Sequence, residues 1–132
     1  MKFLRILFGA LFGLIGCSKT TFDGPGSKSD VTHLRKVWGV DLPAPDAVLV
    51  KKAADLMVYM VQQERLQTYE QSIQRDWQPV GSGTVIQHEQ FVVDGSADTK
   101  ARYTKWKGDD GRMRYIVLDY STGVVSYFSL GK

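Results

Sequence analysis

The sequence predicts an α+β domain in which N-terminal helices pack on a four-stranded antiparallel meander. Three observations predict this class. From about residue 45 to residue 77 the composition favours helices, and an apolar stripe recurs there at helical spacing. Beyond residue 79 the chain is rich in Val, Tyr, Phe, Ile and Thr, in runs separated by short turns containing Gly or Asp. Because the helical half precedes the strand half, we expect it to cover one face of the sheet.

The first residues have the features of an export signal. Lys2 and Arg5 come before an apolar stretch, residues 6–15, and the single cysteine follows at Cys17. This stretch has ten residues, whereas a helix that spans a hydrocarbon core needs about 20. The residues before Cys17 also differ from the A-x-A-like site of the ordinary signal peptidase. A spanning helix and a standard secretory leader are therefore both disfavoured.

The segment Leu14-Ile15-Gly16-Cys17, placed after basic residues and an apolar core, resembles the lipobox of bacterial lipoproteins. The resemblance implies a signal peptide over residues 1–16 and a palmitate-type lipid on Cys17, which becomes the first mature residue. It also implies a lipid-anchored location on the periplasmic face of the outer membrane, since Ser18 replaces the aspartate typical of inner-membrane retention. Two or three acyl chains hold a domain firmly, whereas one binds a membrane only marginally.

The mature chain is nearly neutral. Without the leader it has 15 Lys and Arg against 14 Asp and Glu, so its charge gives no general attraction to nucleic acid. Because the lone cysteine carries the lipid, the domain has no intramolecular disulfide and depends on its core.

A flexible tether is predicted over residues 17–30, and a single domain over residues 31–132. The tether is polar, contains Gly and Pro, and has one aromatic residue, so it lacks the apolar content needed to pack. A coil of this length reaches roughly 20 Å.

Two helical segments are predicted at the start of the domain. Asp30 is predicted to cap the first helix and Gly39 to end it. Its apolar residues fall at helical spacing: Val31, Leu34, Val37 and Trp38. The second segment runs from Pro45 to Trp77, and its stripe consists of Tyr59, Leu66, Tyr69, Ile73 and Trp77.

The second segment leaves two questions open. A single helix over its whole length would be about 50 Å long, so we expect a break near Ala54 or Asp55. The apolar run at residues 56–61 is compatible with either a helix or a buried strand, because periodicity does not distinguish them.

Four strands are predicted to form the meander. The third is apolar at both sets of alternating positions and is therefore expected to be central. Their ranges are 84–93, 100–107, 112–120 and 124–130.

The sequence contains no recognisable catalytic or metal-binding motif. His33 and His88 lie outside any paired-ligand arrangement, and residues 81–84 lack the spacing and lysine of a phosphate-binding loop. Asp109 and Asp110 are explained by turn chemistry. We therefore expect a protein without enzymatic activity, cofactor or metal.

One segment has a local excess of positive charge interleaved with aromatic residues. Alternation along a strand places Lys100, Arg102 and Trp106 on one face, and Tyr103, Lys105 and Lys107 on the other. Such a hairpin is either a solvated edge protected by lysines or a surface that meets an acidic protein, lipid headgroups or anionic cell-wall polymer. The candidate partner-binding residues are Lys100, Arg102, Tyr103, Lys105, Trp106, Lys107, Arg112 and Arg114.

Three functions are compatible with these features. The favoured one is a non-enzymatic module that binds another protein of the cell envelope, as assembly accessories, pilot proteins, exclusion factors and immunity proteins do. The second is an NTF2-like carrier or sensor of a lipid or small ligand, with an apolar cavity under Trp77, Tyr103 and Phe128. The third is a cell-wall hydrolase or its modulator, which requires a cleft with paired carboxylates of raised pKa.

Overall fold

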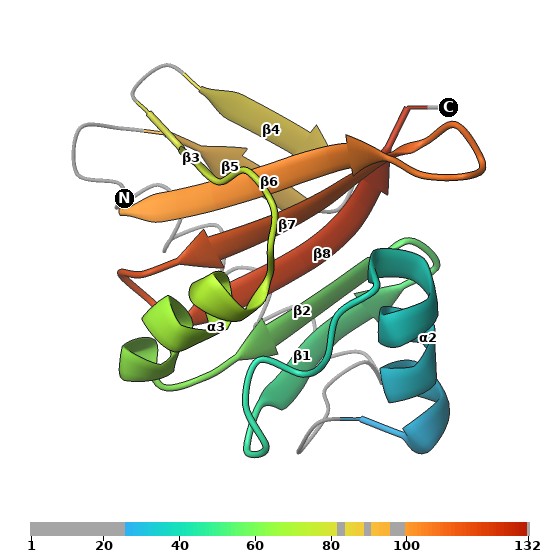
Figure 1. Ribbon diagram of the computed structural model, residues 1–132, viewed down its shortest axis with the longest axis horizontal. Helices are drawn as coiled ribbons and strands as arrows, with labels where there is room; N and C mark the ends of the chain where they lie inside the picture. Colours follow the sequence, from blue (N-terminus) through green and yellow to red (C-terminus); the bar gives the residue numbers. More distant parts are fainter. Residues whose placement is uncertain (1–25, 82–83, 89–90, 96–99, 132) are drawn as a thin grey trace, which may run out of the picture.

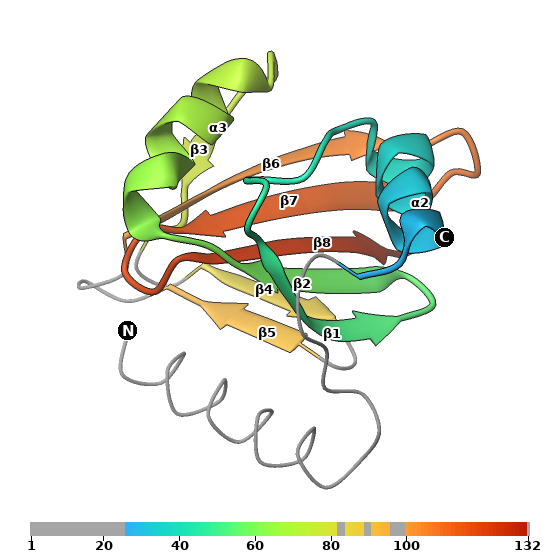
Figure 2. The same ribbon diagram turned by 90° about the horizontal axis from the view of Figure 1, so that it is seen from below.

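The computed structural model describes residues 26–81, 84–88, 91–95 and 100–131. A six-stranded antiparallel sheet forms its centre, with strand order β1-β2-β8-β7-β6-β3. The helices lie on one face of this sheet and a separate two-stranded hairpin lies on the other (Figure 1, Figure 2). Six strands make up the sheet: β1 (Val48–Ala53), β2 (Leu56–Met60), β3 (Gln78–Pro79), β6 (Ala101–Lys107), β7 (Met113–Asp119) and β8 (Val124–Leu130).

The remaining elements cover the two faces. The hairpin consists of β4 (Val85–His88) and β5 (Phe91–Asp94). The helices are α2 (Lys28–Trp38), the 3-10 turn η1 (Gln63–Arg65) and α3 (Leu66–Ser72).

The predicted fold class, helices on a four-stranded meander, is wrong because the protein is mostly β. Much of the segment predicted as a long helix forms the β1–β2 hairpin, with its turn at Ala54 and Asp55, where a helix break was expected. The strand alternative for residues 56–61 is correct for Leu56–Met60. This strand lies between β1 and β8 and is buried on both faces, so packing outweighs the helical preference of the local sequence.

The predicted meander is wrong in its first strand. The predicted strand over residues 84–93 covers two separate strands, Val85–His88 (β4) and most of Phe91–Asp94 (β5), which pair with each other as their own two-stranded sheet. The other three predicted strands are present as β6, β7 and β8, and β7 is central as expected. The neighbour of β8 is β2 rather than a fourth strand of the C-terminal half.

Helix α2 is present as predicted, but Ser27 caps it instead of Asp30. The Asp30 N–H donates to Ser27 Oγ at 3.2 Å, and Asp30 Oδ2 accepts from the Ser27 N–H at 3.0 Å, which makes a capping box. The helix therefore begins within the segment 17–30 predicted as a tether. Burial favours a higher pKa for Asp30, but hydrogen bonds from Lys52 of β1 and from Ser27 outweigh it and lower the pKa below its usual value.

The helix face of the sheet carries the larger core. All five residues of the predicted stripe belong to this core, although Tyr59 comes from the sheet and the others from α3 and the segment after it. Its buried members include Leu34, Trp38, Leu49, Met57, Tyr59, Leu66, Tyr69, Ile73, Ile116, Leu118, Val125 and Tyr127.

A buried hydrogen-bond chain fixes α3 to the sheet. The hydroxyl of Tyr127 on β8 donates to that of Tyr69 at 2.8 Å, and Tyr69 donates to the Asp41 carbonyl at 2.6 Å. Burial raises the pKa of both tyrosines. The chain satisfies two hydroxyls inside an apolar core and joins α3, β8 and the α2–β1 connector.

The β4–β5 hairpin covers the opposite face through a second apolar core. The side chains of Val50, Leu56, Val58, Val80, Ile86, Val93, Val117 and Phe128 are buried there. A polar contact adds to this packing: His88 Nε2 lies 2.8 Å from Asp55 Oδ1, and Arg112 Nη2 donates to Asp55 Oδ2 at 2.5 Å. Burial favours a higher pKa for Asp55, but the hydrogen bonds from His88 and Arg112 lower it overall.

The turn between β7 and β8 requires close contact of two backbones at Gly123. Its φ is 77°, and its carbonyl accepts from the Val61 N–H at 2.8 Å. A methyl group added at Gly123 would lie 2.2 Å from the carbonyl oxygen of Val61. Gly111, in the β6–β7 turn, also has a positive φ (84°), but a methyl group there would meet no atom within 4 Å.

We expect Gly123→Ala to lower the free energy of unfolding by about 2–4 kcal/mol, since it combines backbone strain with a clash. Gly111→Ala adds strain alone and should cost about 1 kcal/mol. Chemical denaturation of both variants measures the difference. Equal losses would show that the contact with Val61 does not constrain the turn.

We expect Asp55→Asn to cost about 1–3 kcal/mol at pH 7, because it removes the charge that His88 and Arg112 share. The folded pKa of Asp55 lies below its unfolded value, so the charged form contributes stability at pH values above about 4. That contribution is lost as the pH falls through the folded pKa. The difference between wild type and variant should therefore shrink in denaturation series taken from pH 7 down to pH 2–3.

The control for this series is Asp46→Asn, because Asp46 is exposed and has no ion pair within the described part of the chain. Its stability should follow wild type at each pH. A constant difference between wild type and Asp55→Asn across the whole range would contradict the role of the Asp55 charge.

Candidate functional site

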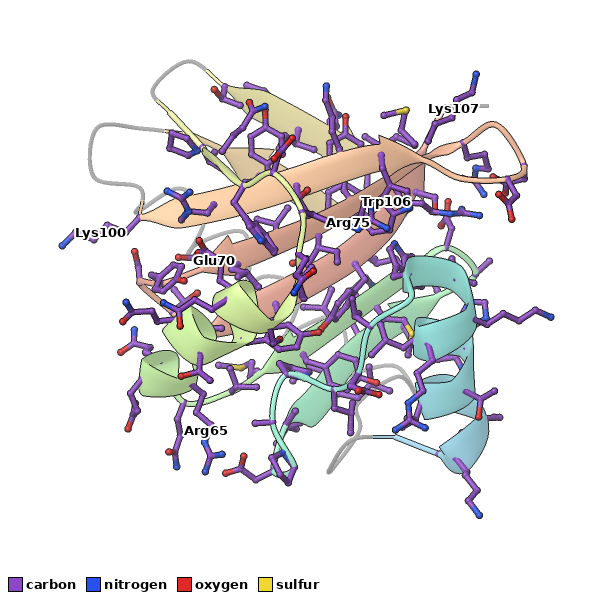
Figure 3. The ribbon with its side chains drawn as sticks, viewed as in Figure 1. Arg65, Glu70, Arg75, Lys100, Trp106 and Lys107 are labelled. Carbon is purple, nitrogen blue, oxygen red and sulfur yellow. The ribbon has the colours of Figure 1, made fainter. Side chains whose placement is uncertain are left out.

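Strand β6 presents the predicted basic and aromatic residues on two different faces, as its alternation requires. Arg102 and Trp106 point to the helix face, where they contact residues of α3 and of the segment after it. Tyr103 packs against the core of the hairpin face. Lys100, just before the strand, and Lys107, at its end, project from opposite ends of β6 (Figure 3).

The Arg102 side chain is held by α3. Its Nε lies 3.0 Å from Glu70 Oε2, and its Nη2 donates to the Trp77 carbonyl at 3.3 Å. The Tyr120 hydroxyl donates to the other oxygen of Glu70 at 2.7 Å. Arg102 therefore fixes the helix to the sheet, and its charge is paired with that of Glu70.

The other two arginines of the candidate set are also paired. Arg112 bonds Asp55, and Arg114 lies 3.1 Å from Asp110 and donates to Ser129 Oγ at 2.6 Å. Because each arginine has a carboxylate partner, much of the predicted positive excess is neutralised within the fold.

The three lysines differ from the arginines. Lys100, Lys105 and Lys107 are exposed, and none of them forms an ion pair with another described residue. Asp109, in the adjoining turn, is likewise exposed. Lysines at an edge keep their charge available for a ligand, whereas paired arginines do not.

The two aromatic residues of the set have structural contacts. Tyr103 stacks on Tyr115 with ring centroids 6.4 Å apart, and Tyr115 stacks on Phe128 at 5.2 Å. On the opposite face, the guanidinium carbon of Arg75 lies 3.5 Å from the ring centroid of Trp106 (Figure 3). Trp106 is half-buried, and the Arg75 guanidinium lies over its apolar ring.

Arg75 is a site residue that sequence reasoning missed. The Ile73 carbonyl accepts from the Arg75 N–H at 2.9 Å and from Trp77 Nε1 at 3.3 Å, which turns the chain sharply after α3. This turn places Arg75 over Trp106. The sequence prediction placed Arg75 only within the helical segment from Pro45 to Trp77, and no local pattern marks a contact between residues so far apart.

The outer edge of β6 is only partly covered. Strand β3 pairs with Arg102 and Tyr103 alone, through Pro79 and Gln78. In the part of the chain that the structure describes, no strand pairs with the outer side of Thr104–Lys107. The candidate site, which we call the β6 edge, consists of this open segment with the cations Lys105, Lys107 and Arg75 and the ring of Trp106.

The two histidines and the buried Asp119 have contacts within the fold. His33 packs edge-on against Trp38, and His88 bonds Asp55. Burial raises the pKa of Asp119, but its Oδ1 accepts from the Ser121 N–H at 2.9 Å within its own turn. Among the described residues, no group of three or more His, Cys, Asp or Glu side chains is placed to hold a metal ion.

Three shallow clefts, of about 340, 320 and 470 Å³, lie near α2 and α3. None of them is lined by Trp77, Tyr103 or Phe128, the residues expected around a carrier's cavity. Trp77 belongs to the core of the helix face, whereas Tyr103 and Phe128 belong to that of the hairpin face. These residues therefore belong to cores on opposite faces of the sheet.

Within the described residues, no helix is long and apolar enough to cross a membrane. Residues 1–16 and Cys17, the predicted signal and lipid site, lie outside the described part of the chain.

No protein-family model matches this chain, and no curated protein or solved structure matches it either.

Proposed function

We propose that this chain is a lipoprotein of the bacterial cell envelope whose folded domain binds another protein through the β6 edge. In this proposal Cys17 carries the lipid, the anchor lies in the outer membrane, and the domain faces the periplasm. The observation that carries the binding function is the stretch of β6 that no described strand covers, beside Lys105 and Lys107, which have no ion pair with any described residue. The lipid anchor rests on the sequence of residues 14–17.

The rigidity of β6 supports a binding role. The strand pairs with β7 over its whole length, from Ala101↔Asp119 to Lys107↔Met113, and its helix face is held by Glu70 and Arg75. A surface that is already ordered loses less conformational entropy on binding, so more of the contact energy becomes affinity. Attachment to the membrane further raises the effective concentration near an envelope partner.

The difference between the paired arginines and the exposed lysines also supports a binding role. Arg102, Arg112 and Arg114 are held in ion pairs, whereas Lys105 and Lys107 have no such partner among the residues that the structure describes. Edge lysines protect a sheet from pairing with a second copy of itself, because like charges would face each other. The same charges attract an acidic partner and speed its association. The same lysines therefore both oppose pairing with a second copy of the chain and favour an acidic partner.

The lipid anchor is tested by Cys17→Ser in a Gram-negative host. We expect the wild type to take up an alkyne-palmitate label and to fractionate with membranes, since the thiol is the acyl acceptor. The variant should be unlabelled and should keep its leader. Ser18→Ala is the neighbouring control and should label normally. Normal labelling of Cys17→Ser would refute the anchor.

The binding site is tested by placing a photo-crosslinking amino acid at Asp109, next to the β6 edge, in cells with intact envelopes. We expect one crosslinked partner, and at least a tenfold weaker crosslink in the double variant Lys105→Glu/Lys107→Glu, because attraction becomes repulsion.

The matched control is Lys28→Glu/Arg65→Glu, which changes the net charge equally. Both residues are exposed, Lys28 as the first residue of α2 and Arg65 directly before α3, where an acidic side chain is favoured. Its crosslink should equal that of wild type. Equal loss in both double variants would mean that net charge, and not the β6 edge, governs the interaction.

A further inference from the structure

Along β6, the backbone N–H and C=O groups of successive residues point alternately toward β7 (inward) and away from it (outward). The Ala101 carbonyl accepts from the Val80 N–H at 2.9 Å on the outer side. On the inner side, the Lys100 carbonyl accepts from the Tyr120 N–H at 2.7 Å, and the Gly108 N–H donates to the Arg112 carbonyl at 2.7 Å. Because these groups alternate along a strand, residues 101, 103, 105 and 107 direct their N–H and C=O groups outward.

Strand β3 uses only the first part of this pattern. It pairs with β6 through Gln78 and Pro79. The segment before β3 does not continue the ladder, because it crosses the helix face of β6 with Arg75 over Trp106 (Figure 1). The outward groups of Lys105 and Lys107 therefore face a position where a strand is absent among the described residues.

The side chains around this position are cationic on both faces of the sheet. Lys105 and Lys107 flank it on the hairpin face, and Arg75 with Trp106 flanks it on the helix face. An added strand would point successive side chains to alternate faces. Acidic side chains at every second position would meet the lysines, and the intervening ones would meet Arg75 and Trp106.

We propose that an extended, acidic segment of the partner pairs with β6 as an additional strand beside Lys105 and Lys107. This inference rests on the proposed function and specifies the partner's chemistry and mode of binding. Main-chain hydrogen bonds provide the attachment, and the alternate charges provide the selectivity. A second copy of this chain is a poor occupant, because lysine would face lysine across the new ladder.

The direct test is amide hydrogen exchange measured by NMR on the folded domain. The probe is a synthetic peptide of alternating Glu and Val, about seven residues long to match a typical strand. We expect its binding to slow exchange at Lys105 and Lys107 at least tenfold, because their N–H groups become bonded. The amides of Thr104 and Trp106, which face β7, should not change. An alternating Lys and Val peptide is the charge control and should have no effect.

A pair of variants separates the backbone bond from the charge. Lys105→Gln and Lys105→Pro both remove the positive charge, but only the proline removes the N–H. An outward N–H at an edge is a position that tolerates proline without breaking the inner ladder. We expect Lys105→Gln to bind the acidic peptide within a few-fold of wild type, and Lys105→Pro to bind at least tenfold more weakly. Lys107→Gln and Lys107→Pro repeat the comparison at the second outward position, and thermal unfolding checks that each variant is folded.

The outcomes distinguish the two proposals. If the crosslink from Asp109 persists equally in Lys105→Pro and Lys105→Gln, the partner binds without strand addition and this inference is overturned, while the proposed function stands. Binding of the acidic peptide without protection of the Lys105 and Lys107 amides overturns it in the same way. If no partner crosslinks to the wild type at Asp109, both proposals fail.

Discussion

The pairing of β2 with β8 is the constraint on which the rest of the structure depends. This ladder, from Leu56↔Phe128 to Met60↔Val124, joins the first hairpin to the last three strands. Because β2 is buried on both faces, it also serves both cores: Met57 and Tyr59 lie under the helices, and Leu56 and Val58 lie under the β4–β5 hairpin. With β8 in the interior, the outer strands are β1 on one side and β6, partly covered by β3, on the other.

Local signals were sufficient for some elements and not for others. The α2 helix has a capping residue and a terminal glycine close in sequence, and β6 to β8 are separated by clear turn residues, so these elements could be predicted. The β1–β2 hairpin could not, because β2 is held as a strand by pairing with residues 124–128, far along the chain. The β4–β5 hairpin was missed because Glu89 and Gln90 give no turn signal.

The candidate site could likewise be predicted only in part. Its charges and aromatic residues could be read from the sequence, and the alternation of β6 separated them correctly into two faces. Which charges stay available depends on carboxylates that the fold brings in, such as Glu70 beside Arg102 and Asp55 beside Arg112. The same applies to Arg75, since only the turn after α3 places it on Trp106. Composition thus located the segment, and tertiary structure decided which of its residues can meet a partner.

The N-terminal part of the described chain contacts the β1 side of the sheet, whereas the proposed partner site lies on the β6 side. At the start of the described residues, a methyl group added at Gly26 would lie 2.8 Å from Leu49 of β1, and Asp30 is joined to Lys52 of the same strand. The β6 edge is the opposite side, roughly 20–25 Å away at the usual strand spacing. For a chain anchored through Cys17, tension between membrane and partner would cross the sheet along its hydrogen bonds. The β1–β2 and β2–β8 ladders have five residue pairs each, against seven in β6–β7 and β7–β8, so the half of the sheet nearer the anchor would open first under load.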